Sequence, residues 1–188
     1  MMPREVSDNR ILEAMVEIPR HLFVETKWEK VAYSDAKLPL TPTRAMLQPE
    51  VLGKILQEAN ISATDKVLDI ACGSGYSTAI ISRLAGWVVG VEVDKELAYR
   101  ASLLLPKLQL NNLAIKHGEL LAGDHSAAPF NKIIINIPIE HKAIEPLLAQ
   151  LINGGKLFVI EGCGKVTKLV EYLNNDNNYS RLELFEAA

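Results

Sequence analysis

The chain has 188 residues, 48% of them hydrophobic and 23% charged, a composition typical of globular proteins and unlike disordered, collagen-like or disulfide-rich chains. Its 20 Lys and Arg against 23 Asp and Glu give a net charge of −3, which offers no basic field for a nucleic acid. No stretch approaches the about 18 continuous apolar residues of a membrane span, and the charged start MMPREVSDNR lacks the apolar region of a signal peptide. We therefore expect one cytoplasmic domain over residues 1–188, with neither a nucleic acid nor a membrane as partner.

Cysteine usage bears on compartment and metal binding. Cys72 and Cys163 are the two cysteines of the chain, which are too few for a disulfide framework or a cysteine metal cluster. This count favours a reducing compartment and predicts no metal site.

Residues 1–65 are predicted to form helices and a loop. Apolar residues at helical spacing run through Asn9–Lys30 and are interrupted by Pro19, a pattern that predicts two short helices. Three prolines crowd Leu38–Pro49, which predicts a long segment without regular structure. Long loops inside compact domains are usually functional or disordered.

Residues 66–188 are predicted to form the core. Short apolar runs alternate there with helical segments expected near 76–85, 95–105 and 140–152, as in parallel βαβ units covered on both faces. The segments 166–173 and 179–185 flank an Asn-rich turn and predict an antiparallel hairpin, although 166–173 could be a helix on pattern alone. The predicted parallel strands are Val67–Ala71, Trp87–Val93, Leu113–Gly118, Ile133–Ile137 and Lys156–Ile160.

These elements predict an α/β fold: a doubly wound, mostly parallel, Rossmann-like sheet with an antiparallel C-terminal hairpin and an N-terminal helical and loop extension. In such sheets ligands bind at the carboxyl ends of the strands, where the strand order reverses and helix N-termini converge.

A glycine-rich turn marks this place in the sequence. The apolar strand that contains Asp69 runs into Gly73-Ser74-Gly75 and then a helix. Glycines at 73 and 75 let the backbone turn tightly and approach a ligand. On these two glycines alone, a simple strand-to-helix turn remains an alternative.

Two further strands end in carboxylates. Glu92 can accept both hydroxyls of an adenosine ribose, and Glu119 can accept a hydrogen bond from the adenine amino group. Glu92 could instead be a solvated cap for the helix that begins near Asp94. Three successive strand-end acids around one glycine turn favour a nucleoside-containing cofactor.

The alternatives are a dinucleotide oxidoreductase and a methyltransferase. The dinucleotide fingerprint G-x-G-x-x-G requires a third glycine where this chain has Thr78. Asp69 suits a cationic ligand, and S-adenosylmethionine carries both a sulfonium and an amino group. The pattern therefore favours S-adenosylmethionine and methyl transfer.

Several short motifs, spread over nearly the whole chain, occur together. They are Glu17–Val24 (V-P-R-x-x-F-V in the pattern they match), Ala32-Tyr33, Leu38–Leu40, Gln48-Pro49, Val67–Asp69 with Gly73–Tyr76, His117-Gly118, Ala128–Phe130, and Gln150-Leu151 with Gly154-Gly155. This combination resembles the protein-L-isoaspartate O-methyltransferase family of class I methyltransferases. The resemblance implies methyl transfer from S-adenosylmethionine to the α-carboxyl of isoaspartate in a damaged protein or peptide, which initiates repair.

The cofactor site predicted from the strand ends and the resemblance comprises Asp69, Ala71, Cys72, Gly73, Ser74, Gly75, Tyr76, Glu92, Val93, Glu119, Leu120 and Asn136. Three of these residues have a second interpretation. Cys72 is better explained as a small buried residue than as a nucleophile. Tyr76 can pack in the core or touch the ligand, and Asn136 can contact cofactor or acceptor or act as a simple cap.

The chain departs from the family pattern in the predicted lid. Ala45, Met46, Leu47 and Gln48 stand where the family has T-I-S-Q, so the usual Thr and Ser hydroxyls are missing. The resemblance makes these four residues the substrate-facing part of a lid over Leu38–Pro49, and no catalytic residue is assigned. A carboxylate acceptor is already ionised at pH 7 and attacks the sulfonium methyl without a general base.

Two other functions remain open on the sequence. One is a methyltransferase with a different acceptor, which the apolar segment Ala45–Leu47 favours. The other is a non-catalytic S-adenosylmethionine-binding module, which the missing serine favours. The sequence does not define the oligomeric state.

Overall fold

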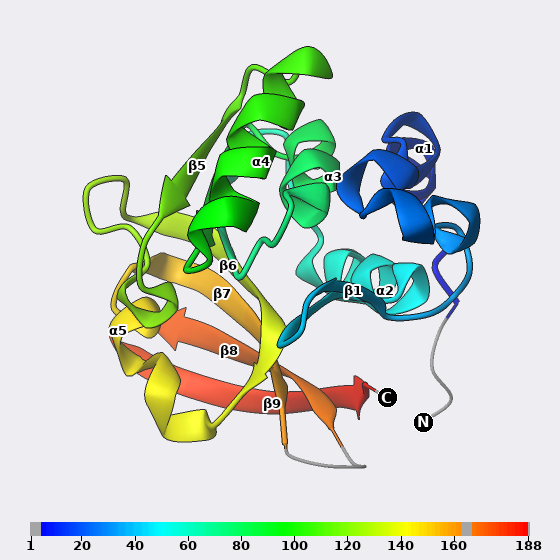
Figure 1. Ribbon diagram of the computed structural model, residues 1–188. Coiled ribbons are helices and arrows are strands. Elements are labelled where there is room, and N and C mark those ends of the chain that lie inside the picture. The colour runs from blue at the N-terminus through cyan, green and yellow to red at the C-terminus, as the bar shows by residue number, and fades with distance from the viewer. Residues whose placement is uncertain (1–4, 163–166, 188) are drawn as a thin grey trace.

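The computed structural model describes residues 5–162 and 167–187. Its centre is a mostly parallel β-sheet (Figure 1). Within these residues the main sheet has seven strands in the order β5-β4-β3-β6-β7-β8-β9. The pairs from β5 to β7 are parallel, and β8 and β9 add antiparallel strands at one edge. The predicted fold class is confirmed.

The strands match the predicted apolar runs, with longer β6 and β7. They are β3 (Lys66–Ile70), β4 (Trp87–Glu92), β5 (Leu113–His117), β6 (Phe130–Ile139), β7 (Leu151–Glu161), β8 (Lys168–Asn175) and β9 (Asn178–Glu186). The hairpin β8–β9 confirms the antiparallel prediction over a helix, although its predicted start at Val166 lies outside the described residues. Its turn places Asp176 and Asn177 at φ of 53° and 65°, a left-handed conformation that Asp and Asn tolerate.

Two of the three predicted core helices are confirmed, as α3 (Tyr76–Leu84) and α4 (Lys95–Lys107). The prediction for 140–152 is wrong in extent, because a 3-10 turn (His141–Ile144) leads into a single α-turn, α5 (Glu145–Leu148), and β7 begins at Leu151. Leu151 has helical spacing from Leu147 but pairs with Phe130 of β6. Tertiary pairing therefore overrides the local helical pattern.

The N-terminal segment contains one predicted α-helix, α1 (Asn9–Glu17), capped by the Asp8 carboxylate, which accepts a hydrogen bond from Arg10 N. The second predicted helix is replaced by two 3-10 helices, Arg20–Phe23 and Thr26–Val31. A further helix, α2 (Pro49–Ala59), follows the predicted loop, and α1 packs against both α2 and α3.

The prediction that Leu38–Pro49 lacks regular structure is wrong. β1 (Leu38–Thr41) and β2 (Arg44–Met46) form a separate antiparallel hairpin, the β1–β2 hairpin. Its prolines occupy positions that need no N–H donor: Pro39 lies in a two-stranded ribbon, Pro42 lies between the strands and Pro49 is the first residue of α2. Prolines are compatible with strands at such edges.

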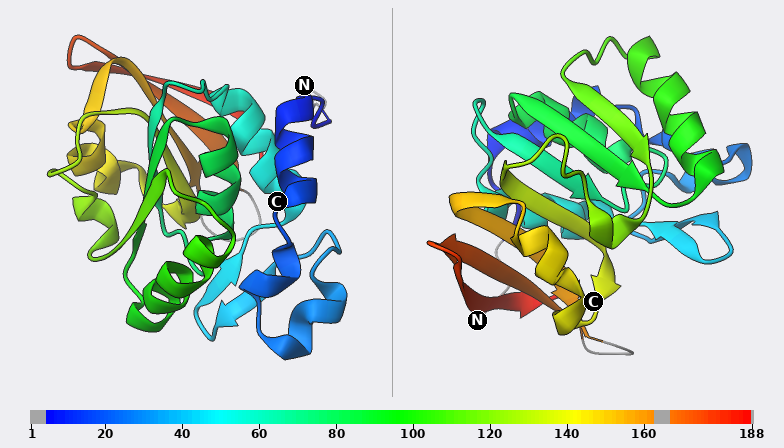
Figure 2. Two further views of the ribbon diagram at one scale, coloured as in Figure 1. Left: turned by 90° about the horizontal axis from the view of Figure 1, so that it is seen from above. Right: turned by 90° about the vertical axis from the view of Figure 1, so that its left-hand side faces the viewer.

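Both faces of the main sheet are covered, as predicted. Val67, Ile134 and Phe158 pack in a buried cluster with the residues of α1–α4. Their strand neighbours Leu68, Ile133 and Leu157 join a second cluster with α5, and Figure 2 shows yellow α5 across the sheet from blue α1. None of the helices in the described part of the chain has both the length and the apolar character needed to cross a bilayer.

The strand order reverses at β3, which has β4 on one side and β6 on the other. The carboxyl ends of these three strands therefore form one edge, over which the β1–β2 hairpin lies (Figure 1). This edge is where the predicted site residues meet.

Candidate active site

The glycine turn between β3 and α3 requires its glycines. Gly73 and Gly75 have φ of +60° and +95°, and a Cβ on Gly73 would lie 2.7 Å from Leu40 Cδ1 of the β1–β2 hairpin. A Cβ on Gly75 would lie 3.1 Å from Ala101 Cβ of α4. The turn therefore brings the hairpin and α4 close to the backbone that the sequence predicts to face a cofactor.

Asp69 lies beneath this turn and is fully buried. Its Oδ2 accepts hydrogen bonds from Ser77 Oγ at 2.7 Å and Thr78 Oγ1 at 2.6 Å, which ties the first turn of α3 to β3. Burial raises the pKa of Asp69 to about 6, against the opposing effect of hydrogen bonds from Thr78, Ser77 and Asn136. Asp69 thus holds the elements that form the site.

Asn136 reaches the same carboxylate from β6. Its Nδ2 donates to Asp69 Oδ1 at 2.6 Å and to Ile70 O at 3.0 Å. Its Oδ1 is buried and has no hydrogen-bond partner among the described residues. An unsatisfied buried acceptor is costly unless something donates to it, so this oxygen is suited to a ligand N–H group.

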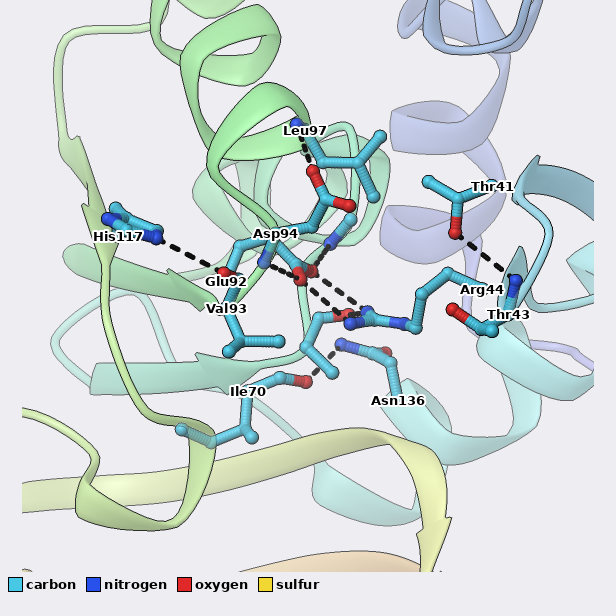
Figure 3. Close-up of polar contacts among 12 residues, drawn as sticks. Thr41, Thr43, Arg44, Ile70, Glu92, Val93, Asp94, Leu97, His117 and Asn136 are labelled. Atoms are coloured by element: carbon cyan, nitrogen blue, oxygen red, sulfur yellow. Dashed lines mark hydrogen bonds and ion pairs between the residues drawn. The ribbon is translucent and has the colours of Figure 1, made fainter.

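Glu92, at the end of β4, is fully buried and accepts four hydrogen bonds. Gly73 N donates to Oε2 at 2.7 Å and Asp94 N to Oε1 at 2.9 Å. Arg44 supplies the other two, from Nη1 to Oε1 at 2.7 Å and from Nη2 to Oε2 at 2.8 Å (Figure 3). The alternative of a solvated helix cap is wrong, because the Asp94 side chain caps α4 by accepting from Glu96 N and Leu97 N.

Two cavities lie against the β1–β2 hairpin. The smaller, about 20 Å³, separates Ala45, Met46 and Leu47 from the glycine turn and has room for about one water molecule. The larger, about 210 Å³, shares Ala45, Met46, Leu47 and Asn136 with the smaller one and is also lined by Lys37 and Arg44. The segment Ala45–Leu47 therefore borders both cavities.

The other predicted residues take varied places. Cys72 is buried, and its burial raises the thiol pKa, as suits a small packing residue better than a nucleophile. Ser74 Oγ donates to Phe23 O at 2.6 Å. Tyr76 is buried and packs edge-on against Phe23, which confirms its interpretation as a core residue; it also lines the smaller cavity, and its contact with a ligand stays a prediction.

The remaining predicted residues lie at the rim. Val93 and Glu119 are exposed beyond β4 and β5, and Leu120 packs against the cluster near α5. In the lid, Met46 and Leu47 are buried and Ala45 is exposed. Gln48 precedes α2, with a buried Oε1 that has no partner among the described residues.

Sequence reasoning missed two arginines. Arg44 meets the strand-end carboxylate, and Arg20 donates to Ala32 O and to Leu47 O, both at 2.8 Å, with its guanidinium 4.8 Å from the centre of the Tyr76 ring. Arg20 is part of a motif quoted above, but its burial cannot be seen in sequence. Arg44 could have been predicted as a partner of the strand-end acids, because it is a cation within the predicted lid.

The amino-acid sequence is similar to those of known proteins. A sequence model of the family described as Protein-L-isoaspartate(D-aspartate) O-methyltransferase (PCMT) matches residues 2–185. The chain is 37% identical over 182 residues to the protein-L-isoaspartate O-methyltransferase of Pseudoalteromonas translucida (strain TAC 125), covering 96% of this chain and 85% of that protein. The enzyme of the same name from Proteus mirabilis (strain HI4320) is 34% identical over 179 residues, covering 95% of this chain and 86% of the relative.

Solved structures show the same fold. One protein-L-isoaspartate O-methyltransferase structure superposes with a TM-score of 0.86 at 22% identity, covering 97% of this chain, which spans 60% of that longer chain. A putative protein-L-isoaspartate O-methyltransferase from Plasmodium falciparum, solved with S-adenosyl-L-homocysteine, gives a TM-score of 0.79 at 16% identity, covering 97% of this chain and 90% of that one. Since the family match runs through both the glycine turn and the β1–β2 hairpin, we conclude that the chain belongs to the protein-L-isoaspartate O-methyltransferase family.

Proposed function

We propose that the chain transfers a methyl group from S-adenosylmethionine to the α-carboxyl group of L-isoaspartyl residues in damaged proteins or peptides, the first step of their repair. The observation that carries this function is the meeting of Asp69, Glu92 and Asn136 at the glycine turn, next to a cavity that contains two cationic residues, Lys37 and Arg44. Family membership supports this reaction and this cofactor.

The residues at the turn fit the cofactor. Glu92 already receives two parallel N–H groups from Arg44, where two ribose hydroxyls would donate. The unpaired Asn136 Oδ1 provides an acceptor for the amino group. We assign the cofactor to Asp69, Ala71–Tyr76, Glu92 and Asn136, with Val93, Glu119 and Leu120 around the adenine.

The acceptor chemistry makes modest demands on the protein. The cofactor supplies a methyl group activated by its sulfonium. The acceptor carboxylate is ionised at neutral pH, so no side chain has to remove a proton. Met46 at the end of β2 and Leu47 directly after it are buried apolar residues that exclude water, which favours a reaction in which opposite charges neutralise each other.

We further propose that residues 1–188 act as one methyltransferase domain in the cytoplasm. The hairpin of residues 1–65 contacts Glu92 and Ala71 of the core, so both parts contribute to one site. Cys72 is a free thiol, which suits a reducing compartment.

Leu47 favours one alternative, a methyltransferase with a different acceptor. It is 9% exposed and provides no hydroxyl where the family pattern has serine, so it cannot orient a carboxylate by donating a hydrogen bond. The experiment below separates the two acceptors.

The test restores the missing hydroxyl. We expect the wild-type protein to methylate an isoaspartyl peptide slowly, and Leu47→Ser, alone or with Ala45→Thr, to raise the rate by lowering the barrier by roughly 1–3 kcal/mol. Radiolabelled methyl transfer to the peptide measures this rate. Leu47→Ala is the matched control, since it removes the same bulk without adding a donor and should not accelerate the reaction.

One result would contradict the isoaspartyl assignment. It is an inactive wild type that binds S-adenosylhomocysteine and stays inactive on the peptide after both substitutions. That result would favour another acceptor or a non-catalytic binding module.

A further inference from the structure

Arg44 is the one arginine of the β1–β2 hairpin, and its side chain is 12% exposed. Besides its two bonds to Glu92, Nη2 donates to Ala71 O at 3.1 Å. Its Nε is buried and has no partner among the described residues. Figure 3 shows the guanidinium lying between Glu92 and Asn136, at the carboxyl ends of β4 and β6.

The four acceptor positions of Glu92 are all filled. A carboxylate offers about four lone-pair sites, and those of Glu92 receive Gly73 N, Asp94 N and the two Arg44 nitrogens. Gly73 and Asp94 donate from the backbone of the turn and of the start of α4, so they cannot leave without unfolding the site. Ribose hydroxyls can therefore reach Glu92 only if Arg44 leaves it.

The small cavity beside the hairpin also indicates that Arg44 is displaced when a cofactor binds. The cavity between the hairpin and the glycine turn has a volume of about 20 Å³, which is too small for a nucleoside. A cofactor bound at the turn needs more room than this cavity offers, so we expect the hairpin to shift when the cofactor binds and to carry Arg44 with it.

The displaced guanidinium has a cavity beside it. Arg44 already lines the 210 Å³ cavity together with Lys37 and the apolar residues Met46 and Leu47. None of the described residues that line this cavity is an Asp or Glu. A guanidinium that has lost Glu92 would remain unpaired there unless an anion enters, and a carboxylate matches its two parallel N–H groups.

We propose that Arg44 is a substrate-positioning residue, which Glu92 holds in the cofactor-free protein and which the cofactor releases to bind the acceptor carboxylate. This inference rests on the proposed function and supplies the hydrogen-bond donor that Leu47 lacks. It makes binding ordered, with the cofactor first. Because coupling between two sites is reciprocal, the acceptor strengthens cofactor binding by the same factor.

The first experiment measures cofactor affinity without any acceptor. In Arg44→Met, Glu92 is free for the ribose, so calorimetry should show S-adenosylhomocysteine binding about tenfold more tightly than to the wild type, the scale of one charge-assisted bond. Arg83→Met removes a half-exposed arginine paired with Glu17 and serves as the charge-matched control, with unchanged affinity. Equal or weaker binding by Arg44→Met would overturn the proposal, because it would make Arg44 a support for Glu92 and not its competitor.

The second experiment measures acceptor binding. A fluorescent isoaspartyl peptide should bind the wild type about tenfold more tightly when S-adenosylhomocysteine is present, and Arg44→Met should abolish this gain. Glu92→Gln weakens the hold on Arg44 and should therefore strengthen peptide binding in the absence of cofactor. A peptide affinity that does not depend on cofactor in the wild type, or that Arg44→Met leaves intact, would overturn the proposal.

The two proposals fail on separate measurements. An inactive wild type that binds S-adenosylhomocysteine and gains no isoaspartyl methylation from Leu47→Ser with Ala45→Thr contradicts the proposed function. Calorimetry on Arg44→Met needs no turnover, so a failure to tighten S-adenosylhomocysteine binding contradicts the role of Arg44 whether or not the enzyme methylates the peptide.

Discussion

Asp69 is a carboxyl group that the fold buries completely, and its main contacts are neutral donors from Ser77, Thr78 and Asn136. Burial raises its pKa from the ordinary value of 3.8 to about 6. The folded protein therefore binds this proton more tightly than the unfolded chain does. Asp69 contributes stability below about pH 4, and this contribution is lost as the pH rises through about 6.

We predict that Asp69→Asn removes this pH dependence. Between about pH 4 and 7, the free energy of unfolding of the variant should gain on that of the wild type by about 3 kcal/mol, since one pKa unit corresponds to about 1.4 kcal/mol. Urea unfolding over a pH series measures the difference. A difference that stays constant over this range would contradict the account of Asp69.

Asp124 offers a control of opposite sign. Burial acts to raise its pKa, but hydrogen bonds from Lys116 and Ser126 outweigh burial and hold the pKa below its ordinary value. Its contribution to stability is present above the pKa of the unfolded chain and is lost as the pH falls. As the pH rises, the free energy of unfolding of Asp124→Asn should therefore fall relative to that of the wild type, whereas that of Asp69→Asn should rise.

Among the elements, the β1–β2 hairpin packs closely on the glycine turn. Gly73 combines a φ of +60° with a 2.7 Å approach of Leu40 Cδ1 to the place of its missing Cβ. Gly154 has a φ of +76° with nothing near, and Gly118 has neither feature. Comparing the three glycines therefore distinguishes the effect of backbone strain from the effect of contact with the hairpin.

We predict that alanine substitution lowers the free energy of unfolding most at Gly73, less at Gly154 and least at Gly118. Backbone strain should cost roughly 1–2 kcal/mol at Gly73 and Gly154, and moving the tip of the buried Leu40 side chain should add about 0.5–1.5 kcal/mol at Gly73 alone. Thermal unfolding measures the three variants. If Gly73→Ala cost no more than Gly154→Ala, the hairpin would not pack on the turn as described.

The elements also show how far sequence reasoning reaches. The strands, α3, α4 and the glycine turn follow from local patterns, because apolar runs buried on both faces and glycines at positive φ leave clear signals. The β1–β2 hairpin does not, because its three prolines suggest an irregular segment and its pairing is held by contacts with the distant turn. Likewise β7 begins at Leu151 through pairing with Phe130, which local spacing does not reveal.

The candidate site divides in the same way. The acid at Glu92 was predicted from its place at a strand end, since parallel strands bring such residues to one edge. Its partner Arg44 lies 48 residues away in sequence, and only the packing of the hairpin brings the two together. The sequence therefore identified Glu92 as a candidate site residue and did not reveal Arg44, its ion-pair partner.

Across the whole molecule, hydrogen bonds tie the N-terminal elements to the candidate site. Arg20, in the first 3-10 helix, donates hydrogen bonds to Ala32 O, after the second 3-10 helix, and to Leu47 O in the predicted lid. Arg44 connects the lid to the core by its ion pair with Glu92. Under the proposed function, the sheet edge would bind the cofactor and the N-terminal elements would face the acceptor. The family match over residues 2–185 spans both parts.

Methyl transfer to a matched pair of peptides that differ only in an isoaspartyl or a normal aspartyl linkage tests the proposed activity. The purified protein and S-adenosylmethionine are incubated with each peptide, and mass spectrometry follows methyl ester formation. We predict a slow ester signal on the isoaspartyl peptide and none on its aspartyl isomer. Equal methylation of the two peptides, or cofactor binding without methylation of either, would contradict the account.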